Sequence, residues 1–403
     1  LPITSLPEYI TVMAEITTGR REAQRWQLAA DVLTAYRRNP HASRVRLADG
    51  LHLGSGTMSE LVGRLLAHEL LREAPAPAAG RGRPTTLFRP HSNAPAVIAV
   101  DIAAAGWQIG VAGVDGRFTR HGGAAHESYL PAVVLGKVRT AITAELDHLG
   151  QRAAGVAVSI AATVQGTLVH SSALGWEAES LESLAVGLPL TLCNDATAAG
   201  VAEARRGAAR GANVSLHLHV LSGLGGGLCV GGVPTVGATG AASEYGHMPF
   251  GDPTLPCECG ARGCWLQSVG GVALARAMGA DHLSRPEQVT AAWAALGKLE
   301  PSAPVPDAVR SQIVALARGT AGLVNGLDPE VVTLGGLAPK LRAAAPKEFD
   351  DAYLAGLMRY RRPRPPRVRD GKLGTDAPVL GVVELALDKA LNASALALRA
   401  ARS

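Results

Sequence analysis

The N-terminal part of the chain repeats its apolar side chains with the period of helices. Residues 20–40 predict one long helix that ends at an Asn-Pro step. Residues 42–51 predict a short helix with Ser43 as its N-cap, and a tight glycine-bearing turn separates it from a third helix within 54–71. Two short helices joined by such a turn after a longer one are typical of a helix-turn-helix. The apolar face of the third helix consists of Met58, Leu61, Val62, Leu65 and Leu66.

A stretch rich in proline and glycine follows over residues 72–90. Proline and glycine exclude a regular helix there, whereas the two flanks could pair as a β-hairpin. Arg81 and Arg83 would then occupy the tip of a wing beside the helices. The alternative is a linker without fixed structure.

From residue 95 onward the pattern changes to short apolar runs, such as "VIAVDIA" and "GVAVSI", that alternate with alanine-rich helical stretches. This alternation predicts an α/β fold. A strand-turn-strand start near Val97 is echoed by a second one near Val214, which indicates two duplicated subdomains. We therefore expect an N-terminal helix-turn-helix domain with an extension over 1–90, a first α/β subdomain over 91–200 and a second over 201–403.

The positive charge is concentrated in the N-terminal part. The whole chain has a formal net charge of +5, whereas residues 20–90 hold twelve arginines and six acidic residues, a net charge of +6. Such a segment is typical of a part that meets a polyanion such as DNA, although a solvated basic face has the same composition. A second basic stretch, from Arg359 to Arg369, could be a solvated loop, a contact for an acidic partner or an accessory DNA contact.

The composition also bears on location. No apolar run approaches the roughly 18 residues of a membrane helix, and the N-terminus lacks the basic start and apolar core of a secretory signal. Five cysteines, an odd number, do not suggest a disulfide framework. We expect a cytoplasmic protein without a membrane partner.

Three of the five cysteines lie close together, ten residues after a histidine. His247, Cys257, Cys259 and Cys264 supply the four ligands of a closed tetrahedral zinc site. Four protein ligands leave no position for a metal-bound water, so the expected zinc is structural. The alternative is a group of free thiols with a histidine nearby by coincidence. Cys193 and Cys229 are expected to be ordinary buried residues.

These residues carry a specific resemblance to a known family. Glu244-x-Gly246-His247, followed by Cys257-x-Cys259-Gly260-x-x-Gly263-Cys264, resembles the zinc signature of the ROK family of repressors, unassigned reading frames and sugar kinases. Asn194-Asp195-Ala196 resembles another segment of that family. The basic N-terminal helices and the "GRGRP" stretch resemble the winged helix of its repressor branch, so the resemblance covers nearly the whole chain.

The resemblance implies a fold and an effector site. The fold is a winged helix-turn-helix before a duplicated pair of RNase-H-like, actin/hexokinase-like subdomains. The implied contacts for a sugar-type effector are Asn194, Asp195, Glu244 and His247, with zinc orienting the loop that holds His247. For Asn194 and Asp195 the alternative is a structural cap between a strand and a helix.

The resemblance also allows kinase chemistry to be tested against the sequence. Kinase members have Asp-x-Gly-Gly-Thr at the first turn, whereas this chain has Asp101 followed by Ile102, Ala103, Ala104 and Ala105. The glycine-rich turn from Ser222 to Gly227 is nearly intact, although tight packing also explains such a turn. We therefore expect no catalytic residues and no enzymatic activity. Leu266 and Ala173 replace a family glutamate and asparagine, which indicates a less polar or atypical effector, or none.

DNA contacts follow from the expected third helix. Its first turns present Ser55, Thr57 and Ser59 to the major groove. Glu60 would contact a cytosine, face the solvent or pair with Arg64. Ser43 and Arg44 would contact phosphates, and Arg81 and Arg83 the minor groove. Operators of the repressors that this chain resembles are usually paired half-sites, so the resemblance implies a homodimer or a dimer of dimers.

Together these observations predict a DNA-binding transcriptional regulator, in the first place a repressor, with a zinc-stapled and catalytically silent effector domain. Two alternatives stay open: a residual sugar kinase, and a regulator controlled by a protein partner instead of a small molecule.

Overall fold

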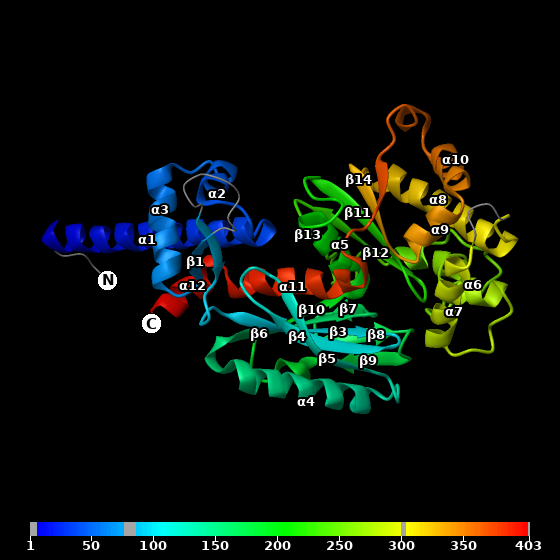
Figure 1. Cartoon of the computed structure of the whole chain (residues 1–403), viewed down its shortest axis with the longest axis horizontal. Helices are drawn as coiled ribbons and strands as arrows, with labels where there is room; N and C mark the ends of the chain where they lie inside the picture. The colour runs from blue at the N-terminus through cyan, green and yellow to red at the C-terminus, as the bar shows by residue number, and fades with distance from the viewer. Residues whose placement is uncertain (1–5, 76–85, 300–303, 402–403) are drawn as a thin grey trace.

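The computed structural model describes residues 6–75, 86–299 and 304–401, which form a helical head and a body of two α/β lobes (Figure 1). Helix α12 (Ala393–Ala400), the last of the chain, returns to the head and lies against the first helix, α1 (Leu6–Arg38) (Figure 1). No helix within the described residues is both long and apolar enough to cross a membrane.

The head contains the three expected helices, and their order in the sequence is confirmed. Helix α1 (Leu6–Arg38) begins earlier than the periodic pattern predicts and ends just before Pro40, whose ring is incompatible with a continuing helix. Helices α2 (Arg44–Gly50) and α3 (Ser55–Ala67) follow. Strands β1 (Leu71–Pro75) and β2 (Thr86–Pro90) pair antiparallel, so the expected hairpin forms. Arg81 and Arg83 lie outside the described residues.

The two lobes repeat one sheet topology, which confirms the duplication expected from the sequence. In each five-stranded sheet, the first three strands in sequence form an antiparallel meander, and two later strands add in parallel beside the first. The first sheet has the order β10-β6-β3-β4-β5, with β3 (Ala96–Ala103), β4 (Gly106–Ala112), β5 (Phe118–Ala125), β6 (Ala153–Ile160) and β10 (Leu190–Asn194). The second has the order β13-β12-β11-β14-β15, with β11 (Val214–Val220), β12 (Leu224–Val230), β13 (Val233–Pro234), β14 (Val331–Gly336) and β15 (Arg367–Asp370).

Helices and a small third sheet complete the lobes. Helix α4 (Pro131–Leu149) covers the outer face of the first sheet (Figure 1). A small sheet of β7 (Thr163–Gln165), β8 (Leu168–Ser171) and β9 (Trp176–Ser180) extends the first lobe. The second lobe holds α6 (Gly271–Ala277), α7 (Arg285–Gly297), α8 (Asp307–Leu327), α9 (Ala338–Ala344) and α10 (Pro346–Gly356).

Two helices cross the middle of the molecule side by side. Helix α5 (Asp195–Arg205) starts at the end of β10, and α11 (Ala377–Ala390) packs along it (Figure 1). Their backbones approach so closely that a Cβ atom on Gly381 would lie 1.7 Å from the carbonyl oxygen of Ala198. Only glycine fits at this crossing. The expected division at residue 200 assigns α11 to the second subdomain, whereas the helix packs against β3 and β6 of the first.

The head shares a core with the first lobe. Buried side chains of α1 and α3, such as Leu33 and Leu61, belong to one apolar cluster with Leu387 of α11, Leu396 of α12 (Ala393–Ala400) and Val97 of β3. Helix α12 packs directly on α1. The head is therefore packed on the body by apolar burial, which is the largest favourable contribution to such contacts.

A buried cluster of charges lies at the same junction. Arg37, at the end of α1, and Arg205 and Arg206, at the end of α5, surround Glu384 and Asp388 of α11. Arg37 Nε lies 2.9 Å from Glu384 Oε2, and both side chains are almost fully buried, at 1% and 0% exposure. Burial opposes the charge of Glu384, but the three guanidinium groups hold the pKa of its carboxyl below the usual value. These charges connect the head, α5 and α11 at one point.

Candidate functional site

A cavity of about 510 Å³ lies where residues of both lobes meet. The four expected effector contacts, Asn194, Asp195, Glu244 and His247, all line it. Asn194 and Asp195 stand at the carboxyl end of β10 and the start of α5. Glu244 is the N-cap and His247 the last residue of a short 3-10 helix of the second lobe. The fold thus brings together residues that are about fifty positions apart in the sequence.

Asn194 has a structural task in this arrangement. Its side-chain oxygen accepts from the backbone N–H of Thr197 at 2.9 Å and caps α5, while its amide nitrogen donates to the carbonyl of Ala162 at 3.0 Å. This is the structural alternative that the sequence left open. An amide has two donor hydrogens and two acceptor lone pairs, so Asn194 retains one of each for a ligand.

Glu244 links the two lobes across the cavity. Its Oε1 accepts from the hydroxyl of Thr163, the first residue of β7, at 2.7 Å. Thr163 belongs to no recognisable sequence motif, and sequence reasoning missed it because only the fold brings it close to Glu244. A rotation of one lobe against the other would change this contact.

Asp195 holds its proton unusually well. Burial, together with the nearby charge of Asp101, raises the pKa of Asp195 to about 7. Burial also raises the pKa of Asp101 to about 6, although Ser159 donates a hydrogen bond to it at 2.6 Å. Near neutral pH Asp195 can therefore both donate and accept a hydrogen bond, and it can take a proton from a bound hydroxyl.

A second cavity, of about 370 Å³, adjoins the first. It shares Asp195, His219 and Leu221 with the larger cavity and also includes Asp101 and Gly336. Sequence reasoning did not identify it, since its walls come from both sheets and from the segment before α11. Burial lowers the pKa of His219 to about 4, so this histidine is neutral there.

The cysteine cluster has the geometry of a metal site. The ligand atoms of His247, Cys257, Cys259 and Cys264 all lie within 4.8 Å of one another. The Nδ1 atom of His247 is 3.7 Å from Cys257 Sγ, and Cys259 Sγ is 3.6 Å from Cys264 Sγ. Two sulfurs on a zinc tetrahedron with bonds of about 2.3 Å are separated by about 3.8 Å, so this donor set fits zinc.

The chain folds back in the cysteine loop through two glycines with positive φ. Gly260 has φ +90° and Gly263 has φ +71°, conformations that other residues rarely adopt. The backbone N–H of Cys257 donates to the carbonyl of Ala261 at 2.8 Å and closes the turn. Cys193 and Cys229 are buried elsewhere, as expected.

The two turns against which kinase chemistry was tested differ in structure. Gly225 and Gly227 are packed against α5: a Cβ on Gly225 would lie 2.8 Å from Ala196 Cβ, and one on Gly227 would lie 3.0 Å from Thr197 Cα. Packing therefore explains these glycines. In the first turn, Ala104 and Ala105 have negative φ, so alanine is not strained there and its backbone N–H groups remain.

The expected DNA contacts lie in the head, apart from the cavity. Ser55, Thr57 and Ser59 are exposed on the first turns of α3. Ser43 caps α2 by accepting from Arg46 N at 3.4 Å, and Arg44 forms an exposed ion pair with Glu73.

The expected pairing of Glu60 with Arg64 is wrong. Glu60 pairs with Arg25 of α1, at 3.0 Å, and Arg64 pairs with Glu22 of the same helix. The neighbouring helix offers closer partners than the next turn of α3.

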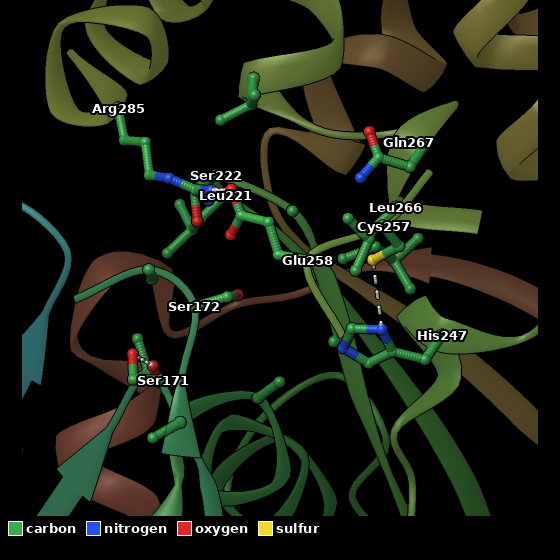
Figure 2. Close-up of a pocket in the computed structure, with 18 of the residues that line it drawn as sticks. Ser171, Ser172, Leu221, Ser222, His247, Cys257, Glu258, Leu266, Gln267 and Arg285 are labelled. Carbon is green, nitrogen blue, oxygen red and sulfur yellow. Dashed lines mark hydrogen bonds and ion pairs between the residues drawn. The ribbon is translucent and has the colours of Figure 1, made fainter. Parts of the chain in front are cut away.

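Further residues at the cavity were missed. Figure 2 shows Arg285, at the start of α7, in an ion pair with Glu258, which lies between two of the cysteines. Both side chains line the cavity. The position of Glu258 within the cysteine motif is a signal that sequence reasoning could have used, whereas nothing in the sequence connects Arg285 with it.

The chain is similar in sequence to a known protein family and to a curated enzyme. The sequence profile described as the ROK family matches residues 97–389. A glucokinase from Streptomyces coelicolor is 31% identical over 152 residues, which are 36% of this chain and 47% of the glucokinase. The chain therefore spans about half the length of that relative.

Two solved structures share the fold. A ROK hexokinase from Thermus thermophilus is 27% identical with a TM-score of 0.55, covering 72% of this chain and 97% of the hexokinase. A ROK family transcriptional regulator, described as a homolog of the E. coli MLC protein, is 17% identical with a TM-score of 0.67, covering 94% of this chain and all of the regulator. The second likeness is one of fold alone.

The expectation that this chain has no enzymatic activity is wrong. Its relatives by sequence and structure include a glucokinase and a hexokinase, and they point to an enzyme. The prediction failed because it relied on the turn after Asp101. Alanine in place of glycine was taken to crowd a phosphate and to lack a hydroxyl, but the backbone at Ala104 and Ala105 is unstrained, and Asp195 stays at the cavity.

Proposed function

Because this chain belongs to the ROK family, we propose that it is a DNA-binding transcriptional regulator whose body binds a sugar-type ligand. The observation that carries the proposal is the direct structural connection between the head and the cavity. Helix α5 begins at Asn194 and Asp195 in the cavity and ends at Arg205 and Arg206 in the buried charge cluster that holds α1.

The head then acts as a winged helix-turn-helix. Its third helix presents Ser55, Thr57 and Ser59 to base edges, Arg44 reaches phosphates from the start of α2, and the hairpin forms the wing. Residues 20–90 carry a net charge of +6, and a DNA contact requires a positive charge of this kind. The likeness to a regulator over 94% of the chain, against 72% for the hexokinase, supports a head of this kind. Repression from paired half-sites by a homodimer is the simplest mode of action.

The body would bind the ligand with polar residues that a metal helps to place. Zinc on His247, Cys257, Cys259 and Cys264 would use Nδ1 of His247 and leave its Nε2 to the cavity. The metal is thereby a structural support for a ligand contact. Asp195 and Glu244 supply the carboxylates that accept hydrogen bonds from sugar hydroxyls.

Ligand binding would reach the DNA through lobe closure. A ligand held by Asp195 of one lobe and by Glu244 and His247 of the other favours the closed arrangement. Closure changes the angle of α5, whose far end holds Arg37 through Glu384 and Asp388. A dimer would convert this shift into a changed spacing of its two heads.

Sugar phosphorylation is a second candidate function, and one observation favours it. Asp195, with a pKa of about 7, lies at the junction of the two cavities, where a base could take the proton of a sugar hydroxyl. Its test is turnover of Mg-ATP with a panel of hexoses by the wild type and by Asp195→Asn. Turnover that disappears in the variant would establish the kinase activity, and it is compatible with DNA binding.

The experiment that tests the regulator is a selection of fragments of the source genome with the purified full chain at near-physiological salt. We expect discrete fragments that share a paired half-site, and we expect Ser55→Glu, which places a carboxylate at the exposed start of α3, to lose them. Enrichment without a common motif, lost equally for both proteins as salt rises, would contradict the proposal.

A further inference from the structure

A third cavity, of about 1250 Å³, lies at the junction of the head with the first lobe. The head contributes residues 67–69, at the end of α3 and in the turn that follows it. The linker between β2 and β3, the turn before β6, the segment that leads into β10, and the helices α11 and α12 supply the rest of the lining. This junction cavity shares no described residue with the cavity between the lobes.

The lining of the junction cavity has an excess of positive charge. Arg152, Lys389 and Arg399 belong to it, whereas Glu69 is the one acidic residue among the described residues that line it. Glu69 already has a partner, because the amide of Asn93 donates to its Oε2 at 2.9 Å. Within the part of the chain that the structure describes, no carboxylate pairs with Arg152 or Lys389. The charge of these two side chains is therefore available to an anion.

The two arginines also hold the linker that joins the head to the first lobe. Arg152 Nε donates to the carbonyl of Ala94 at 3.2 Å. Arg399 Nη2 donates to the carbonyl of the preceding residue, Asn93, at 2.8 Å. The head contacts the same turn through the bond from Asn93 to Glu69. The position of the head relative to the body therefore depends on groups that line this cavity.

The lining offers the donors that a phosphate group needs. A guanidinium has five N–H donors, and Arg152 uses only Nε within the described residues. Lys389 is exposed in the last turn of α11 and brings three further donors. The planar guanidinium binds two phosphate oxygens at once, and the ammonium adds a point charge. The lining also contains apolar side chains that a carbon body can cover, namely Pro95, Ala390, Leu396 and Leu398.

The phosphates of bound DNA are not the expected occupant of this cavity. It adjoins the C-terminal end of α3, whereas the proposed base contacts lie on the first turns of the same helix. A helix of 13 residues is about 20 Å long. A small molecule in the cavity therefore leaves the proposed DNA-binding turns free.

We propose that the junction cavity binds a small organic phosphate, with Arg152 and Lys389 on its phosphate group and the apolar side chains against its carbon body. Such a ligand would connect the linker to α11 and hold the head in one position against the first lobe. Binding itself does not require the proposed function, whereas an effect on DNA affinity rests on it.

The test is titration calorimetry of the purified full chain with phenyl phosphate, inorganic phosphate and benzoate. Inorganic phosphate lacks the carbon body, and benzoate has a carboxylate in place of the phosphate. We expect phenyl phosphate to bind about tenfold more tightly than either, because only phenyl phosphate satisfies both the cations and the apolar groups. Hydrogen–deuterium exchange should then slow in the linker at 91–95 and stay unchanged in the cysteine loop at 257–264.

Lys389→Met should weaken the binding of phenyl phosphate by about tenfold, since a hydrogen bond to a charged group is lost. Lys389→Arg should restore most of the affinity. Lys389 is exposed and unpaired within the described residues, so these variants should fold. Arg152→Met is the second cavity variant. The matched control is Lys298→Met at the end of α7, an exposed lysine that does not line the cavity and should bind as the wild type does.

Three results would overturn the inference. They are the absence of phenyl phosphate binding, equal affinity in the wild type and Lys389→Met, and protection from exchange that spares the linker. Benzoate that binds as tightly as phenyl phosphate would overturn the choice of a phosphate. A chain that selects no DNA fragment but binds phenyl phosphate in this way would contradict the proposed function and leave the junction site intact.

Discussion

The cavity and the head differ in how their binding residues are placed. In the cavity, Asp195 comes from α5 and Glu244 and His247 from a 3-10 turn of the other lobe, and the latter two have supporting contacts with Thr163 and with the other metal ligands. In the head, the proposed base contacts Ser55, Thr57 and Ser59 are all exposed on the first turns of the single helix α3. In a site built from distant segments, loss of one supporting contact displaces several binding residues. In a row of exposed contacts on one helix, each substitution removes only its own share of the binding affinity. Single changes should therefore have large effects in the body and small effects in the head.

The largest effect is expected from breaking the metal site. Cys264 is fully buried within the cluster, and Cys264→Ser should lose the bound metal and weaken ligand binding at least tenfold, because the loop that places His247 loses its support. The readouts are metal content by mass spectrometry and ligand affinity by calorimetry. Cys229→Ser, buried outside the cluster, is the control and should keep one metal per chain. Equal metal content in all three proteins would refute the zinc assignment.

The second-largest effect is expected at the buried charge cluster between the head and the body. Arg37→Met removes one positive partner from the buried cluster, so the negative charge of Glu384 is less well neutralised. The free energy of unfolding should therefore fall by about 3–5 kcal/mol. Arg25→Met breaks an ion pair whose side chains are half exposed, so its cost should be about 0–1 kcal/mol. Urea unfolding of both variants measures the difference. Similar losses would show that the junction is not held by its buried charges.

A pH effect should follow from the carboxyl groups at the cavities. The pKa values of Asp195 and Asp101, about 7 and about 6, exceed the usual 3.8, so the folded state keeps protons that the unfolded state has lost. The free energy of unfolding should therefore fall as pH rises from about 4 to about 7. Asp195→Asn cannot titrate and should flatten this slope, which unfolding at a series of pH values will show. A slope unchanged in the variant would mean that Asp195 titrates normally.

The smallest effects are expected in the head. Ser55→Ala, Thr57→Val and Ser59→Ala should each weaken binding of a selected DNA fragment by about 0.5–1.5 kcal/mol and should combine almost additively, without loss of stability. Fluorescence anisotropy at fixed salt measures this. Ser43→Ala should instead destabilise the short helix that Ser43 caps. If no hydroxyl of α3 affects DNA binding, the contact lies elsewhere in the head.

The sequence predicted the local features well. The strands near Val97 and Val214, the helices of the head and the cysteine cluster all follow from periodicity or spacing within a few dozen residues. The topology of the two sheets then confirmed the duplication.

Long-range features could not be predicted in this way. Nothing in the sequence joins Arg37 to Glu384, which lie 347 positions apart, or Glu258 to Arg285. The second cavity and the return of α11 to the first lobe are also products of tertiary packing. The error on enzymatic activity came from judging kinase chemistry by the first turn alone, where alanine was taken to crowd a phosphate, whereas the relatives by sequence and structure include a glucokinase and a hexokinase.

The most direct test of the account is the affinity of the wild type for a selected operator fragment with and without a cavity ligand found by calorimetry. Reciprocal coupling predicts that saturating ligand changes DNA affinity by about 5–150-fold, and that the operator changes ligand affinity by the same factor. Asp195→Asn should lose the response while it still binds DNA. An operator affinity that stays the same at saturating ligand would contradict the claim that the cavity and the head are connected.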